Sequence, residues 1–301
     1  MKGLFFVLCL VLIFSMLGCS NDVEPPVVRN GVWARLSEQL NNDPSTPAGF
    51  NTIRAGVTYG TVQTYTYFSN TTGANRSVNI FTPPYFDPSQ TYPVLYLLHG
   101  IGGTHTEWMG GQPNEIISNL IADGMTVPMI MVMPNVRARQ NDSASGDQIS
   151  AENIAAFNNF INDLRDDLMP FIEANFPITH ERSQTAIAGL SMGGRAALQI
   201  GVSMSEAFMY IGSFSTAPGV LGPGGLFQPG ELTIPDEFIN DTFILLNNGD
   251  NEQLFANVTM GVYNAFRANG VTPVHYVTPG GHDFSVWRNG LYHFARNIFH
   301  R

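Results

Sequence analysis

From about residue 57 onward, the chain alternates between short apolar runs and longer stretches with helical spacing. Residues 57–69 and 76–84 are rich in Val, Thr, Tyr and Phe and are flanked by turn residues, which predicts antiparallel strands at a sheet edge. Later runs are short and mainly apolar, which is typical of strands covered on both faces of a parallel sheet. These runs are residues 93–98, 128–133, 184–188, 208–212, 242–246 and 274–277.

Two longer segments between these runs have helical spacing. In residues 151–176 the apolar positions lie three and four apart, as on one helix face, and Pro170 is expected to kink or end that helix. Residues 252–270 form a second such segment, closed by Gly270 as a C-cap. Strand–helix alternation predicts one α/β domain, a doubly wound and mostly parallel sheet with antiparallel N-terminal edge strands and no large lid domain.

The first 19 residues resemble a targeting segment. Lys2 precedes an apolar run from Leu4 to Leu17, which is shorter than the roughly 20 residues of a membrane span. "MLGC" resembles a bacterial lipobox with Cys19 as the lipidated residue. We therefore expect a lipoprotein-type signal peptide at 1–19, a polar tether at 20–52 and a catalytic domain at 53–301. The expected location is the outer membrane or cell surface, with a periplasmic or secreted protein as the alternative.

Charge and cysteine content exclude several classes of partner. The formal net charge is −10 and no basic run is present, which argues against nucleic acid, and against a membrane partner other than through a lipid at Cys19. The two cysteines, Cys9 and Cys19, both lie in the N-terminal segment, so none remains for a disulfide or a cysteine metal site. Neither a metal-ligand spacing nor a cofactor motif is found, and we expect no metal or cofactor.

The segment "AIAGLSMGGRAALQIG" places Ser191 between an apolar strand and a helix-forming stretch. A serine on such a sharp strand-to-helix turn is a nucleophile elbow, in which the glycines permit close backbone approach. A glycine-rich turn without chemistry is the competing interpretation, because G-x-S-x-G alone is a weak motif. The flanking strand and helix favour Ser191 as a nucleophile.

A serine nucleophile needs a base and an acid, which in this fold follow in the order Ser, Asp/Glu, His. His282 lies in a glycine-rich loop directly after the run 274–277, where such sheets collect their sites. Asp250 follows the run 242–246 and is the predicted acid. Weaker candidates for the acid are Glu252 and Asp241, whereas Asp283 neighbours His282 too closely in sequence to face it.

An oxyanion also needs hydrogen-bond donors. The N–H of Met192, directly after the nucleophile, is one candidate, and the N–H of Ile101 in "LLHGIGG" is the other. His99 in the same motif is expected to hold the shape of the loop. The motif matches neither G-x-G-x-x-G nor the P-loop, which argues against a nucleotide site.

Four segments together resemble one known family: "YPVLYLLHGIGG", "AIAGLSMGG", "NNGD" and "GGHDFSVWRNGLYHFA". They are similar to the esterase D-type α/β-hydrolases, in particular the feruloyl esterases of plant cell-wall degradation, including those fused to bacterial xylanases. The resemblance spans about residues 56–300. It implies Ser191 as nucleophile, His282 as base, Asp250 as acid, and Ile101 and Met192 as oxyanion amides. "NNGDNE" departs from the Thr-Asn-Asp run that relatives often carry at the acid.

The resemblance further implies hydrolysis of a hydroxycinnamoyl ester on arabinose through an acyl-enzyme, so the expected partner is a feruloylated or acetylated cell-wall polysaccharide or a small ester. Trp287, Trp108 and Phe284 are candidates for an aromatic acyl pocket, with core packing as the alternative for each. The loops 137–150 and 215–238 are expected beside the cleft. An acetylxylan esterase, a general carboxylesterase, an acyltransferase and a non-catalytic glycan-binding lipoprotein remain open as alternatives.

Overall fold

The computed structural model describes residues 30–179, 181–219 and 232–299. The predicted signal peptide with Cys19 and residues 20–29 of the predicted tether lie outside the described residues, as does part of the loop 215–238. Within the described ranges, no helix is both long and apolar enough to cross a membrane.

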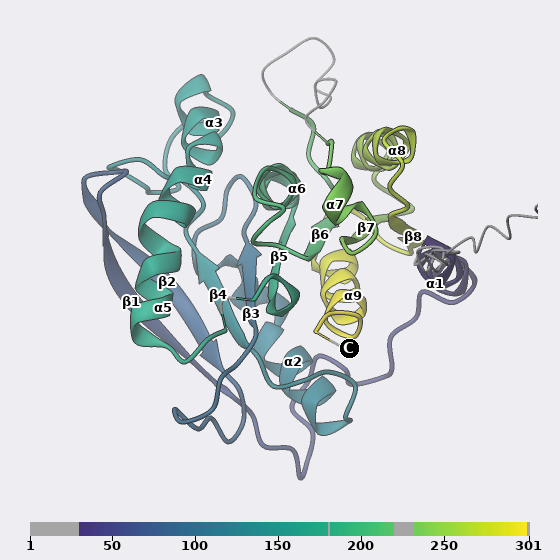
Figure 1. The fold of residues 1–301 in the computed structure, drawn as a ribbon, viewed down its shortest axis with the longest axis horizontal. Coiled ribbons are helices and arrows are strands. Elements are labelled where there is room, and N and C mark those ends of the chain that lie inside the picture. The colour runs from purple at the N-terminus through teal and green to yellow at the C-terminus, as the bar shows by residue number, and fades with distance from the viewer. Residues whose placement is uncertain (1–29, 180, 220–231, 300–301) are drawn as a thin grey trace, which may run out of the picture.

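One sheet organises the described part of the chain (Figure 1), with strands in the order β1-β2-β4-β3-β5-β6-β7-β8. The strands are β1 (Thr61–Ser69), β2 (Ala74–Thr82), β3 (Val94–Leu98), β4 (Ile130–Pro134), β5 (Thr185–Leu190), β6 (Tyr210–Phe214), β7 (Phe243–Gly249) and β8 (Val274–Thr278). β1 and β2 pair antiparallel at the edge, and β3 to β8 pair in parallel. The predicted fold class is confirmed, and each predicted strand lies within a few residues of an observed one.

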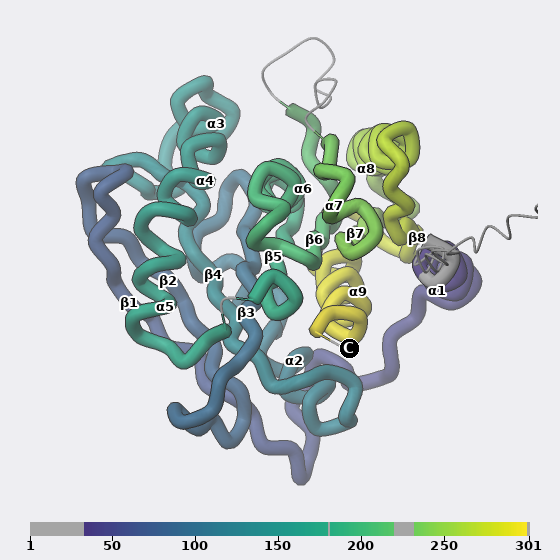
Figure 2. Tube along the Cα trace, viewed as in Figure 1, coloured from purple at the N-terminus to yellow at the C-terminus, as the bar shows by residue number. Residues whose placement is uncertain are grey.

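Helices cover both faces of this sheet, as the ribbon and the tube views show (Figures 1 and 2). On one face lie α3 (Ala151–Asn158), α4 (Phe160–Asp163), the π turn η2 (Leu164–Leu168), α5 (Met169–Asn175), α6 (Met192–Ser203), α7 (Asp236–Ile239) and α8 (Gln253–Ala268). On the other lie α1 (Asn30–Asn42), α2 (Pro113–Ala122), α9 (Phe284–Ala295) and the 3-10 turn η1 (Glu107–Gly111). A further 3-10 turn, η3 (Arg182–Gln184), leads into β5.

The strand pattern explains why both faces are covered. In β3 every residue is buried, and alternate side chains enter opposite layers: Val94, Tyr96 and Leu98 join one core cluster, while Leu95 and Leu97 join the other. A strand that is apolar at every position can only be accommodated between two helical layers. The continuous apolar runs therefore determine the three-layer architecture.

The helical segment 151–176 is interrupted twice. α3 ends at Asn158, and the π turn Leu164–Leu168 directly precedes Met169 and Pro170. Proline has no backbone N–H to donate, which explains why regular α-helix does not continue through this point. The predicted distortion near Pro170 is confirmed, and Gly270, with φ +82°, closes α8 as expected.

The predicted tether is wrong from residue 30 on. α1 packs along the β8 edge, where Ser37 Oγ donates to His275 O at 2.6 Å and accepts from His275 N at 3.1 Å. Trp33 also lies against Phe243, with ring centroids 5.9 Å apart. A helix at this place satisfies backbone groups of an edge strand that would otherwise face water. The folded domain thus begins about twenty residues before the predicted boundary at 53.

Candidate active site

Ser191 lies at the turn between the carboxyl end of β5 and the amino end of α6. Its backbone has φ +53° and ψ −118°, a conformation that a residue with a side chain rarely adopts. Strain of this kind costs on the order of 1–3 kcal/mol and persists only where the surrounding structure enforces it. Here the Ser191 N–H donates to Phe214 O of β6 at 2.8 Å, and Ser191 O accepts from Arg195 N at 3.0 Å.

The glycines around Ser191 are required by close packing of the backbone. A Cβ on Gly193 would lie 2.5 Å from Leu98 O, and one on Gly194 would lie 2.6 Å from Ser213 Oγ. A Cβ on Gly189 would lie 2.9 Å from Gly194 N. Only glycine fits at these positions, so the spacing in "AGLSMGG" has a steric cause.

His282 lies in the loop between β8 and α9 and faces the serine. Its Nε2 is 3.0 Å from Ser191 Oγ. The imidazole stacks on Phe255 of α8 with ring centroids 3.5 Å apart, and the Trp287 ring system lies almost perpendicular to it with centroids 5.1 Å apart. The ring is therefore fixed between two aromatic side chains in the orientation that directs Nε2 at the hydroxyl.

The acid that faces His282 is Glu252, not Asp250 as predicted. Glu252 Oε2 lies 2.8 Å from His282 Nδ1, and the carboxylate is buried. Its other oxygen, Oε1, accepts from Ser215 Oγ at 2.6 Å and from Gly249 N at 2.5 Å. Two donors besides the histidine thus hold the carboxylate in place.

Asp250 has a different position because the chain turns sharply after β7. Its side chain is exposed and Oδ1 accepts from Gly280 N at 3.0 Å, so it joins the β7 loop to the loop that carries His282. Glu252, two residues later, directly precedes α8 and points back under the imidazole. Asp283 caps α9 by accepting from Ser285 N, and Asp241 precedes β7 at the opposite end of the sheet from Ser191.

The predicted oxyanion amides flank the serine. Met192 is the first residue of α6, so its N–H has no intrahelical acceptor. Ile101 follows Gly100, and Gly100 lies against the nucleophile, because a Cβ there would be 3.4 Å from Ser191 Cβ. Among the backbone hydrogen bonds within the described ranges, neither the Ile101 N–H nor the Met192 N–H has an acceptor.

The chain is also similar to proteins of a known family. Residues 69–297 match the model of the Esterase family, described as "Putative esterase". The chain belongs to the Esterase family.

Curated relatives are similar in sequence to most of this chain. This chain is 31% identical over 263 residues to the endo-1,4-beta-xylanase/feruloyl esterase of Xylanibacter ruminicola. The aligned part covers 85% of this chain and 34% of the relative. This chain is 26% identical over 213 residues to the acetyl esterase of Caldicellulosiruptor saccharolyticus, covering 69% of this chain and 73% of the relative. The chain spans about a third of the length of the first curated relatives it matches.

Solved structures of the same fold are also similar. The CE1 ferulic acid esterase of the anaerobic fungus Anaeromyces mucronatus, solved in complex with ferulic acid, superposes with a TM-score of 0.79 at 29% identity, over 85% of this chain and 97% of the other. A feruloyl esterase module from Clostridium thermocellum, solved with sinapinate, has a TM-score of 0.67 at 20% identity, which supports the fold alone.

The loop that carries Ile101 is held by two ionisable side chains, Glu107 and Arg137, which could not be identified from the sequence. Glu107 Oε2 accepts from Gly100 N at 2.6 Å. The buried Arg137 donates through one Nη to Ile101 O at 2.7 Å and to Gly103 O at 3.1 Å. Burial raises the pKa of Glu107 and lowers the pKa of Arg137. Arg137 lies at the start of the loop 137–150, whose polar composition gave no sign that its first residue would be buried.

His99 also contacts the loop that carries Ile101, in keeping with its expected role of holding the shape of that loop. Its Nδ1 contacts Gly100 O at 2.6 Å, and its Nε2 accepts from Val136 N at 2.8 Å. Burial lowers the pKa of His99 to about 4, so the ring is neutral near pH 7. His99 thus occupies a buried position beneath the loop and not a position in line with Ser191 and His282.

The three predicted pocket aromatics have different environments. Trp108 is 1% exposed and donates from Nε1 to Leu98 O at 2.9 Å, so it is a core residue and its predicted pocket role is wrong. Phe284 packs on Trp108 and against Gly110 and Gly111. Trp287 is buried against His282, and its Nε1 donates to Ser215 Oγ at 3.1 Å. Trp287 therefore contacts the site through the histidine and through the serine that binds Glu252.

Ser215 was not identified from the sequence either. It directly follows β6, is fully buried, and has φ +53°. Its Oγ joins Trp287 Nε1 to Glu252 Oε1, which links the aromatic wall to the acid. The loop 215–238 thus contributes a site residue at its first position, while residues 220–231 lie outside the described part.

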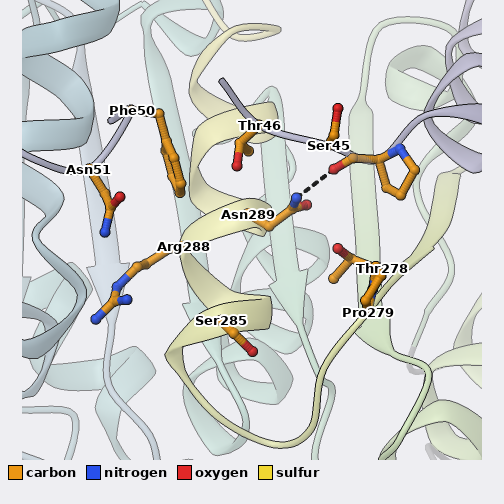
Figure 3. Close-up of a pocket in the computed structure, with 10 residues that line it drawn as sticks. Ser45, Thr46, Phe50, Asn51, Thr278, Pro279, Ser285, Arg288 and Asn289 are labelled. Carbon is orange, nitrogen blue, oxygen red and sulfur yellow. Dashed lines mark hydrogen bonds between the residues drawn. The ribbon is translucent and has the colours of Figure 1, made fainter. Parts of the chain in front are cut away.

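A surface pocket of about 570 Å³ lies beside α9 and the start of the β8–α9 loop (Figure 3). It is bounded by the segment 44–51, by Thr278 and Pro279, and by one face of α9. Asn289 donates to Pro44 O at 2.6 Å and ties that segment to α9. Ser191, His282 and Glu252 are not part of its described lining, so it is separate from the candidate active site. Within the described residues, no group of His, Cys, Asp and Glu could hold a metal ion.

Proposed function

We propose that this chain is a serine carboxylic-ester hydrolase that acts through Ser191, His282 and Glu252. The observation that supports this most directly is the line of short contacts from Ser191 Oγ through His282 to Glu252 Oε2. A neutral imidazole that donates through Nδ1 has its lone pair at Nε2, where the serine hydroxyl lies. This is the arrangement that activates a serine toward an ester carbonyl.

The reaction proceeds in two halves. His282 Nε2 takes the hydroxyl proton while Ser191 Oγ bonds to the acyl carbon, and the carbonyl electron pair moves to oxygen, facing the N–H groups of Ile101 and Met192. His282 then gives its proton to the leaving oxygen, the ester C–O bond breaks, and the alcohol departs. Water attacks the acyl-enzyme by the same route, releases the acid and restores the serine.

Glu252 stabilises the imidazolium that forms in each half. Its carboxylate accepts from Nδ1 and fixes the tautomer, and the bonds from Ser215 and Gly249 prevent it from rotating away. Glu252 lies two positions beyond Asp250, just before α8, and from there the longer side chain of glutamate reaches His282. Fixed donors around the carboxylate preserve its geometry through the cycle.

For the substrate we propose a feruloyl ester, as found on arabinoxylan. Two relatives support this choice: the xylanase/feruloyl esterase of X. ruminicola and the A. mucronatus ferulic acid esterase solved with ferulic acid. An acetyl ester is the second candidate. The similarity to an acetyl esterase favours it, as does the burial of Trp108, which removes one of the aromatic walls expected for a larger acyl group.

The test compares hydrolysis of methyl ferulate and p-nitrophenyl acetate by the purified protein and by its Ser191→Ala variant. Cleavage of both esters by the wild type alone supports the feruloyl esterase. Cleavage of the acetate alone supports the acetyl or general esterase and rejects the feruloyl substrate. If neither ester is cleaved and the protein still binds xylan, a non-catalytic glycan-binding role replaces both.

For location we propose a lipoprotein anchored through Cys19. The support is the apolar run that ends in "MLGC" with a small polar residue, Ser20, after the cysteine. In a bacterial host, the wild type is expected to incorporate labelled palmitate and to sediment with membranes. The Cys19→Ala variant is expected to lose both, and unchanged sedimentation of that variant would reject the anchor.

A further inference from the structure

A second groove, of about 490 Å³, lies at the end of the sheet away from Ser191. It is formed by the start of β1, the loop 83–88 after β2, and the residues that follow α5. The carboxyl end of β2 pairs with the amino end of β4, as Phe81 lies opposite Met131. The groove is therefore at the amino ends of the parallel strands, while Ser191 follows the carboxyl end of β5, about 15–20 Å along the strand direction.

Five of the thirteen described residues that line this groove are aromatic. Tyr65 packs edge-on against Phe176, with ring centroids 5.3 Å apart, and Phe86 stacks on Tyr92 at 5.2 Å. These contacts hold the rings of Tyr65 and Phe86 in fixed positions at the protein surface. The groove therefore presents aromatic rings in fixed positions next to the polar side chains of the lining.

Tyr85 lies at the rim of the groove, in a turn directly after Pro84. Its side chain is 85% exposed, yet its φ is +58°, which is unfavourable for a bulky residue. Pro83, Pro84 and Pro88 restrict the loop around it, and its hydroxyl lies 2.8 Å from Thr58 Oγ1. The turn and the hydrogen bond to Thr58 hold this exposed ring at the rim of the groove, where a ligand can stack on it.

The chemistry of the lining identifies the class of ligand. None of the thirteen described residues that line the groove is charged, although the protein has a formal net charge of −10. Nucleic acid or an anionic membrane would need lysine or arginine there. A concave site of a few hundred Å³ also suits a small unit better than a flat protein interface of about 800 Å² per partner.

Sugars fit the remaining description. Their C–H faces stack on aromatic rings, and their hydroxyl groups bond to amides and hydroxyls at the edge. Gln63 accepts from Tyr65 OH through its amide oxygen at 2.9 Å, which directs its NH₂ group to another acceptor, and Thr61 and Thr82 provide hydroxyls on the neighbouring strands. We propose that this groove binds a neutral polysaccharide chain of the xylan type and holds the polymer on the protein while esters are cleaved elsewhere. The choice of polymer rests on the proposed function.

The test measures depletion of protein by insoluble arabinoxylan. All proteins carry Ser191→Ala so that the polymer is not altered, and Tyr85→Gly is added because glycine adopts a positive φ without strain and keeps the fold. Loss of one stacking ring is expected to weaken binding about three- to tenfold. Tyr85→Phe keeps the ring and is expected to bind as the parent does. Phe68→Ala is the matched control, since Phe68 is 59% exposed on the same edge strand but lies outside the groove.

A second measurement separates this proposal from the proposed function. With Ser191 intact, Tyr85→Gly is expected to cleave methyl ferulate like the wild type but to release less acid from insoluble arabinoxylan. The proposal that this groove binds the polymer would be refuted by any of three results. These are no binding by the parent protein, equal binding by Tyr85→Gly, and an equal loss of binding in Phe68→Ala. Failure to cleave methyl ferulate at all would reject the feruloyl esterase and leave the binding result standing.

Discussion

The identity of the acid can be tested by a pair of substitutions two residues apart. Glu252→Gln keeps the length of the side chain and removes its charge, and it places an NH₂ group where three donors now converge. Asp250→Asn makes the same chemical change at the residue that the sequence predicted. Asp250 is exposed and holds one backbone N–H, so this variant is the matched control.

The expected magnitude follows from the 2.8 Å contact between His282 and Glu252. Two unit charges centred about 3–4 Å apart attract by about 4–6 kcal/mol in an effective dielectric of about 20. That attraction is present only when the imidazole is protonated, as in the transition state, so its loss is expected to lower kcat by about 10³–10⁴-fold. Asp250→Asn loses part of one hydrogen bond, worth about 1 kcal/mol, and is expected to change kcat less than about fivefold.

The assay is p-nitrophenyl acetate hydrolysis near pH 7.5, with thermal unfolding of each variant as the control for folding. Glu252→Asp, which keeps the charge but shortens the side chain, is expected to fall between wild type and Glu252→Gln. Equal losses in Asp250→Asn and Glu252→Gln would refute the assignment, as would a Glu252→Gln enzyme with near-normal kcat. Either result would mean that the acid reaches His282 by a different arrangement during turnover.

Three further predictions concern groups around the site. Ser215→Ala removes a hydrogen bond to the Glu252 carboxylate and is expected to lower kcat about tenfold or more. Ser213 is also a buried serine, near the end of β6, but it bonds to Thr216 and not to Glu252, so Ser213→Ala is expected to leave kcat unchanged. Arg137→Lys cannot reproduce both bonds to the loop that carries Ile101, and it is expected to lower kcat about 10–100-fold with little change in KM. Arg139→Lys, at a partly buried arginine that does not bond to this loop, is the control and is expected to have little effect; equal kcat in both variants would contradict the role of Arg137. Burial lowers the pKa of His99 from 6.5 to about 4, so between these pH values the unfolded state binds more protons than the folded state. The free energy of unfolding is therefore expected to fall as pH drops from about 6.5 toward 4. His99 alone is expected to contribute a loss of about 2 kcal/mol at pH 4.5. Urea unfolding at both ends of that range checks it, and a His99→Gln protein with the same pH dependence would refute it.

The sequence contained most of the active site because the elements that carry it have strong local signals. Ser191 could be predicted from a strand, a glycine-rich turn and a helix in succession, and His282 from a glycine-rich loop after a buried strand. Met192 was predicted from the same turn as Ser191, and Ile101 from the glycine-rich loop after the run 93–98. Asp250 was the wrong acid because order along the chain places Asp250 and Glu252 almost equally, and only the turn into α8 decides which carboxylate faces the imidazole.

Other site residues had no sequence signal. Ser215, Glu107 and Arg137 act on residues 37, 7 and 36 positions away in the chain, respectively, through Glu252, Gly100 and Ile101. Hydrogen bonds between loops depend on how strand ends are arranged, and strand order is not encoded in any local pattern. The burial of Trp108 also had no sequence signal, because an aromatic residue in a glycine-rich loop can face either the core or the cleft.

By itself, the sequence determined the class of fold, because apolar runs buried on both faces require a covered parallel sheet. It also predicted Ser191 and His282 as the candidate nucleophile and base, because glycine spacing reflects backbone contacts within one turn. Tertiary structure decided which carboxylate completes the triad, which side chains brace the oxyanion loop, and that the segment after residue 30 packs on the β8 edge. Those features depend on distances between parts of the chain that only folding brings together. It also gathered an uncharged aromatic groove from three separate segments, which no single stretch of sequence reveals.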